Sequence, residues 1–170
     1  MKCSACTNEA TKSTDLCRNC LVRAIEKRAR KELGKASLTK GMKIAAVNDG
    51  SCAGMVNEYL ARKFITITPV KSIKKAKNGF DLVLTAETAN DQAEKMMGWM
   101  LNSEKQEEPK NSAGMLRDSL LSEVKAYAAI KNIKYKADKR IGSTSGIIAD
   151  LESKYKGATF SIARSYEKLR

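Results

Sequence analysis

Short apolar segments alternate with helix-patterned segments between residues 41 and 102, and this alternation restricts the fold more than any other feature. Three segments have the composition of buried strands: 42–47 (MKIAAV), 64–70 (FITITPV) and 81–85 (DLVLT). Apolar side chains recur at helical spacing over 53–63 and 88–101. Strands separated by helices pair in parallel, because the chain must cross over to begin each new strand at the same end of the sheet. The sequence therefore predicts an α/β fold with a small parallel sheet covered on both faces.

Four of the five cysteines form two C-x-x-C pairs, Cys3 with Cys6 and Cys17 with Cys20. Each pair can turn two sulfurs toward one ion, and four thiolates suit a tetrahedral zinc ion with no open position. Two disulfides are the alternative, but they need an oxidising compartment, and the first residues lack the pattern of a secretory leader. A redox-active C-x-x-C would need one pair only. The spacing predicts one structural zinc ion in a cytoplasmic protein.

The charge balance is strongly basic: 32 Lys and Arg oppose 19 Asp and Glu, and the net charge is +13. Such a field favours nucleic acid as a partner, although a merely solubilising surface is the alternative. No apolar run approaches the roughly 18 residues of a membrane span, so no membrane contact is expected. The absence of histidine excludes a Ser-His-Asp triad and a histidine base. Two basic groups are candidate RNA contacts: Arg18, Arg23, Lys27, Arg30 and Lys31 on a helix over 21–33 and its approach, and Lys71, Lys74, Lys75 and Lys77 in a connection.

Composition divides the chain into four expected parts. They are a zinc module with a basic helix (1–40), a reduced α/β core (41–102), a polar linker containing Pro109 (103–114) and a helical part (115–170). Within the last part, apolar spacing predicts helices over 116–130, 145–155 and 159–169. A length of 170 residues suits one domain with a small appendage.

Several segments stand in a recognisable order. The first strand leads into VNDGSCA (47–53) and the third into TAETANDQA (85–93), and the chain ends with EVKAYAAIKNIKY (123–135) and LESKYKGATFSIARSYEKLR (151–170). Together with the cysteine pairs, this order resembles the PP-loop ATP-pyrophosphatase family of tRNA 2-thiolation proteins. That family has the phosphate loop V-S-G-G-x-D-S after its first strand and T-G-H-N-x-D-D-E-A farther on. The resemblance implies a parallel sheet of the PP-loop type (adenine nucleotide alpha hydrolase-like), an N-terminal zinc module and C-terminal helices.

The segment that resembles the phosphate loop departs from the family motif. The glycines of the motif let backbone N–H groups approach the phosphates closely. Here Asp49 stands in place of one of these glycines and adds a negatively charged side chain. Cys52 stands in place of the loop aspartate and Ala53 in place of the serine, while Glu87 replaces the histidine of the later motif. The sequence therefore predicts a degenerate loop, made of Asn48, Asp49, Gly50, Ser51, Cys52 and Ala53, and argues against bound ATP.

The sulfur-handling cysteines of the family have no counterpart here. Its central C-x-x-C, its cysteine near residues 136–138 and its C-terminal zinc module are all missing, which predicts that no iron–sulfur cluster forms. Cys52 follows a strand, where a thiol can be activated to carry a persulfide; a packed side chain is the commoner role of a lone cysteine.

These departures lead to a functional hypothesis. We expect a non-catalytic protein, a tRNA-binding or scaffolding subunit of a tRNA uridine 2-thiolation complex, paired with a longer catalytic PP-loop protein. One alternative is a divergent but active tRNA 2-thiouridine synthase, an ATP-dependent sulfurtransferase. The other is a stand-alone zinc-dependent nucleic-acid-binding protein.

Overall fold

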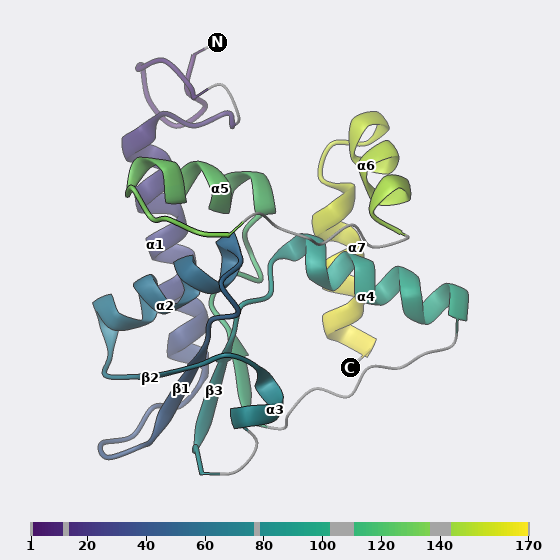
Figure 1. Ribbon diagram of the computed structural model, residues 1–170. Coiled ribbons are helices and arrows are strands. Elements are labelled where there is room, and N and C mark those ends of the chain that lie inside the picture. The colour runs from purple at the N-terminus through teal and green to yellow at the C-terminus, as the bar shows by residue number, and fades with distance from the viewer. Residues whose placement is uncertain (1, 12–13, 77–78, 103–110, 137–143, 170) are drawn as a thin grey trace.

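A computed structural model describes residues 2–11, 14–76, 79–102, 111–136 and 144–169 (Figure 1). Within them, a parallel sheet has the order β2-β1-β3-β4. Its strands are β1 (Ile44–Val47), β2 (Thr68–Val70), β3 (Leu82–Thr85) and β4 (Ser112–Gly114). The predicted α/β class and parallel sheet are confirmed. Strand β2 is shorter than predicted, because Phe64 still belongs to the preceding helix.

Strand β4 lies inside the segment that was expected to be a linker. Its residues Ser112, Ala113 and Gly114 include no β-branched or aromatic side chain, so the local sequence has no strand signal. The strand exists because β3 offers an open edge: Ser112 pairs with Val83, and the Val83 N–H donates to the carbonyl of Asn111 at 2.9 Å. Pairing with a neighbour, rather than local propensity, forms this strand.

Except for the short helix at Ile73–Ala76, which lies in an expected connection, the helices agree closely with the expected ones. They are α1 (Arg18–Lys35), α2 (Cys52–Phe64), α3 (Ile73–Ala76), α4 (Ala89–Asn102), α5 (Leu121–Ile130), α6 (Ser145–Lys154) and α7 (Ala158–Leu169). Helix α5 begins five residues later than predicted, and the Leu120 N–H donates to Glu123 Oε2 at 2.9 Å at its start. None of the helices in the described ranges is both long and apolar enough to cross a membrane.

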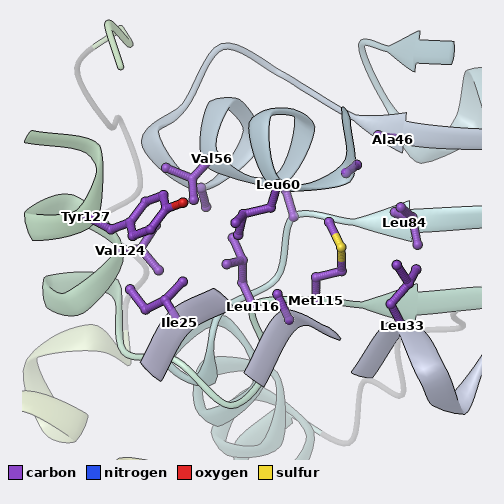
Figure 2. Close-up of a cluster of buried hydrophobic side chains, with 14 of the residues drawn as sticks. Ile25, Leu33, Ala46, Val56, Leu60, Leu84, Met115, Leu116, Val124 and Tyr127 are labelled. Carbon is purple, nitrogen blue, oxygen red and sulfur yellow. The ribbon is translucent and has the colours of Figure 1, made fainter. Parts of the chain in front are cut away.

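The main core lies on one face of the sheet, under α1, α2 and α5. Figure 2 shows side chains from these helices, such as Ile25, Leu60 and Tyr127, in one cluster that extends to Ala46 and Leu84 of the central strands. Met115 and Leu116, which follow β4, complete the same cluster. Alternate residues of the strands point the other way and form a smaller cluster with Ala76 of α3. Within the described residues, α1, α2 and α5 therefore cover one face of the sheet, and the short helix α3 packs on the other.

The remaining helices form a group beside the sheet. Helix α7 packs along α4, and α6 contacts both (Figure 1). Small side chains permit this close approach, since Ala89, Ala93 and Ala163 are buried together with Tyr166. The start of α4 directly follows β3, so this group borders the carboxyl end of the sheet.

Candidate functional site

The four cysteines of the two C-x-x-C pairs converge at the N-terminal end of α1. Their Sγ atoms all lie within 4.8 Å of one another, and those of Cys6 and Cys17 are 3.6 Å apart. A tetrahedral ion with metal–sulfur bonds of about 2.3 Å separates its sulfur ligands by about 3.8 Å. The arrangement therefore fits a metal centre, as expected of a zinc module.

Local backbone geometry builds this cluster. The Cys3 N–H donates to the carbonyl of Asn8 at 2.8 Å and tightens the first turn, while Cys17 immediately precedes α1 and Cys20 lies in its first turn. Residues three apart on a helix face the same side, so the second pair is presented together. The Cys17 N–H donates to Cys3 Sγ at 3.2 Å, and this hydrogen bond lowers the pKa of Cys3 to about 6. Thiolate character at Cys3 favours metal binding, which requires deprotonated sulfur.

The segment between β1 and α2 forms the predicted strand–loop–helix corner. Gly50 has a φ of 86°, a left-handed conformation that favours glycine. The Asn48 side chain accepts from the Gly50 N–H at 2.9 Å, and Ser51 caps α2 by accepting from the Gly54 N–H at 3.1 Å. Cys52 is the first residue of α2 and is completely buried in the main core. The structure thus has a tight turn between a strand and a capped helix, with Cys52 buried at the start of that helix.

A cavity of about 430 Å³ opens at the carboxyl ends of the strands, beside this loop. The chain leaves β1 toward one side of the sheet and β3 toward the other, so the cavity lies at the topological switch point where α/β sheets bind ligands. Its charged and hydroxyl-bearing residues are Asp49, Lys71, Ser72, Lys74, Thr85, Glu87, Asp91 and Lys95. A larger cavity of about 600 Å³ lies along β4 and the end of α1, away from the loop.

A buried ionic group forms one wall of the carboxyl-edge cavity. Glu87, which is 8% exposed, pairs with Lys95 Nζ through one carboxylate oxygen and lies 3.4 Å from Arg117 Nη2 through the other. Asp91, which also lines the cavity, accepts two hydrogen bonds at the start of α4. They come from the Thr88 N–H and from the Thr88 hydroxyl, both at 2.8 Å. Sequence reasoning singled out Glu87 but missed Lys95 and Arg117. Glu87 precedes α4, so helical spacing does not relate it to Lys95, and Arg117 is distant in the sequence; no local signal pointed to either cation.

The candidate RNA-binding residues form two separate groups. The α1 stripe, consisting of Arg18, Arg23, Lys27, Arg30 and Lys31, is exposed along one helix, and the Arg30 guanidinium lies 4.9 Å from the centre of the Phe64 ring. Lys71, Lys74 and Lys75 are exposed around α3, and Lys77 lies outside the described residues. Helices α1 and α3 cover opposite faces of the sheet, so the structure does not bring the two groups together on one surface.

Comparisons with known proteins identify the fold. No protein-family model matches the chain, and no curated protein matches it by sequence. A solved structure does match: the U34-tRNA thiolase NcsA from Methanococcus maripaludis, with its [4Fe-4S] cluster. The TM-score is 0.77 with 17% sequence identity, and the match covers 99% of this chain and 87% of that chain.

This match overturns the prediction of a non-catalytic protein, or pseudoenzyme. That prediction depended on altered residues in two motifs, whereas the structure that shares the fold is an enzyme. The prediction assumed that substitutions in the loop between β1 and α2 would also remove the cavity next to it. The strand–loop–helix corner and a charged cavity beside it are both present despite Asp49 and Glu87.

The prediction that no iron–sulfur cluster forms is also wrong. NcsA carries a [4Fe-4S] cluster, and four cysteines converge in this chain. Cysteine thiolates are the ligands both of structural zinc and of iron–sulfur clusters, so the absence of certain family cysteines does not exclude iron. At the level of fold, the chain is similar to a tRNA thiolase over nearly its whole length.

Proposed function

We propose that this protein is an ATP-dependent sulfurtransferase that thiolates a uridine of tRNA. The observation that carries the proposal is the carboxyl-edge cavity, which lies beside a strand–loop–helix corner in a chain whose fold matches a U34-tRNA thiolase. This is the position at which α/β sheets bind ligands. The predicted degenerate loop and the later motif with Glu87 both border this cavity, as expected if they still serve one site.

The proposed reaction has two steps. The C2 oxygen of the uridine attacks the α-phosphorus of ATP, which releases pyrophosphate and leaves an adenylated base. Sulfide then attacks C2, and AMP leaves with the former C2 oxygen, so that sulfur takes its place. The lysines of the cavity favour the charged phosphates electrostatically.

We propose that Cys3, Cys6, Cys17 and Cys20 hold a metal. Their sulfur separations favour one tetrahedral ion such as zinc, and an iron–sulfur cluster is the other candidate. A closed tetrahedral site contributes folding free energy to the N-terminal segment and leaves no position for a substrate. Its proposed role is to hold the start of α1 in place for contact with tRNA.

The α1 stripe is the proposed tRNA contact. Its exposed cations run from the cysteine cluster along the length of α1 and suit the regularly spaced phosphates of an RNA backbone. The predicted pairing with a longer PP-loop protein stays a prediction, and co-purification from the native host tests it.

The deciding experiment supplies the purified protein with tRNA transcript, ATP, Mg²⁺ and sulfide. We expect pyrophosphate release that depends on tRNA, and a thiolated nucleoside detected by mass spectrometry after digestion. A transcript with cytidine in place of the target uridine is the matched control and should release no pyrophosphate above background. Pyrophosphate and thiolated nucleoside both at background, with tRNA demonstrably bound, would contradict the proposal and favour a nucleic-acid-binding protein without catalysis.

A further inference from the structure

The loop between β1 and α2 uses its own side chains to accept hydrogen bonds from three N–H groups, those of Gly50, Ser51 and Gly54. Asp49 Oδ1 accepts from the Ser51 N–H at 3.0 Å and from the Ser51 hydroxyl at 2.5 Å. The Gly50 and Gly54 N–H groups donate to Asn48 and to Ser51. A helix N-terminus binds anions through such donors, and here they already have intramolecular partners.

Space at the same point is also filled. A Cβ atom placed on Gly54 would lie only 2.6 Å from Asp49 Oδ1, so the carboxylate presses against the first turn of α2. Its negative charge is favoured there by the partial positive charge of the helix N-terminus. A phosphate at the same position would meet both the filled volume and a like charge. Asp49 therefore occupies the anion position of the loop.

The lysines of the cavity lie on its other walls, where Asp91 also lies and accepts hydrogen bonds from the Thr88 N–H and hydroxyl. Glu87 is shared by Lys95 and Arg117, so this group of three carries one net positive charge. The Lys95 side chain is only 18% exposed and lines the cavity. Lys71 and Lys74 line it from the segment after β2, with the Ser72 hydroxyl between them. An anion that enters the cavity is attracted away from the loop and toward these lysines.

We propose that Asp49 acts as an internal substitute for a phosphate, and that Lys95, Lys71 and Lys74 bind the phosphates of ATP in place of the loop. This inference rests on the proposed function and deepens it, because it names the residues that recognise the triphosphate. In this arrangement the phosphates of the nucleotide lie at the lysine-bearing walls of the cavity and not at the loop between β1 and α2.

The test measures binding of ATP to the full chain by equilibrium dialysis, with adenosine as a probe that lacks phosphates. Lys95→Met, and separately the double variant Lys71→Met/Lys74→Met, should each weaken ATP binding by about tenfold or more, because each removes a charge-assisted contact. Adenosine binding should not change. Lys154→Met removes an exposed lysine on α6 that pairs with Asp150, and as the matched control it should leave both affinities unchanged.

Asp49→Asn distinguishes the two possible phosphate positions. The amide oxygen can keep the hydrogen bonds to Ser51 while the negative charge is lost, so phosphates held by the lysines should gain less than about threefold in affinity. A gain of tenfold or more would mean that the phosphates lie on the loop, and would overturn the inference.

The other outcomes are equally decisive. ATP binding that survives unchanged in both lysine variants overturns the inference but leaves the proposed function intact. A wild-type protein that binds no ATP overturns both. If Lys95→Met fails to fold because Glu87 loses a partner, the surface variant Lys71→Met/Lys74→Met still decides the result.

Discussion

Gly114 leaves the space in which the buried Arg117 side chain lies. A Cβ atom at this position would lie 2.4 to 2.7 Å from the Nε, Cγ and Cδ atoms of Arg117, and these atoms cannot move without displacing the guanidinium from Glu87. Gly98 in α4 is the opposite case, because nothing lies within 4 Å of its added Cβ. Identical substitutions at these two glycines should therefore have opposite effects.

Gly114→Ala should destabilise the protein by about 1–3 kcal/mol, the usual effect of overpacking a filled interior. Gly98→Ala should stabilise it by about 0.5–1 kcal/mol, because alanine has the higher helix propensity. Urea unfolding followed by circular dichroism measures both. Equal effects of the two substitutions would show that Arg117 does not pack on Gly114 as described.

Each cysteine of the cluster should be required for metal binding. Cys6→Ser should reduce the metal bound at the cluster and cost several kcal/mol locally at the N-terminal segment, since a structural metal contributes directly to folding. Cys52→Ala is the matched control, because Cys52 lies in the main core rather than in the cluster. Elemental analysis with ultraviolet–visible absorption measures the metal and distinguishes zinc from iron and sulfide. Full metal content in Cys6→Ser would exclude the four-cysteine site.

At the scale of elements, Glu26 of α1 joins three helices. Its Oε1 atom accepts from Lys63 Nζ of α2 at 2.6 Å and from the Tyr127 hydroxyl of α5 at 3.2 Å. Burial alone would raise the pKa of Glu26, but the hydrogen bond and charge of Lys63 outweigh burial and lower it. Burial and the charge of Glu26 raise the pKa of Tyr127, so its hydroxyl stays a donor. These contacts hold α1 against α2 and α5 over the core.

Glu26→Gln should cost about 1 kcal/mol of unfolding free energy near pH 7, the size of a hydrogen bond to a partly buried charge. A carboxyl group whose folded pKa is lowered stabilises the protein above its unfolded pKa and loses this effect as pH falls. The difference between wild type and variant should therefore be present above about pH 4.5, the unperturbed value, and shrink below it.

Asp150→Asn, which removes an exposed pair on α6, should change stability by less than about 0.5 kcal/mol. Denaturation curves from pH 3 to pH 7 measure both. A difference that does not depend on pH would assign the effect of Glu26 to packing.

At the scale of the whole molecule, the net charge is +13, and the helices that carry the two basic groups lie on opposite faces of the sheet. Lysines near α3 line the cavity, whereas the α1 stripe lies on the opposite face and next to the cysteine cluster. We infer that the lysines near α3 bind the small molecule in the cavity, whereas the α1 stripe binds RNA.

Charge reversal in the α1 stripe should therefore weaken tRNA binding more than reversal around α3. For Arg23→Glu/Lys27→Glu/Lys31→Glu, we expect a loss of affinity of at least about tenfold at moderate salt and a shallower dependence on salt, because fewer counterions are released. Lys75→Glu, on the other face of the sheet, should have an effect of less than about threefold. Filter binding at several salt concentrations measures both. Equal losses for the two variants would mean that tRNA contacts both faces.

Features encoded within a short stretch of chain were predictable from the sequence. Amphipathic spacing predicted α1, α2, α4 and α7, and buried apolar runs predicted β1 and β3. The spacing of Cys3, Cys6, Cys17 and Cys20 predicted their convergence, because each pair needs only one turn of chain. A turn after β1 was predicted correctly, but it ends at Ser51 because Cys52 and Ala53 already belong to α2, and the role of Asp49 in it was not foreseen.

Other features depend on contacts between distant residues, and only the folded chain decides them. Strand β4 forms because β3 presents an open edge, and Arg117 reaches Glu87 across thirty residues of sequence. The separation of the two basic groups depends on which face of the sheet each helix covers. Periodicity and propensity act over a few neighbouring residues, whereas strand register and helix packing determine which distant side chains meet. For that reason, the elements could be predicted from the sequence, while the charged lining of the cavity required the tertiary structure.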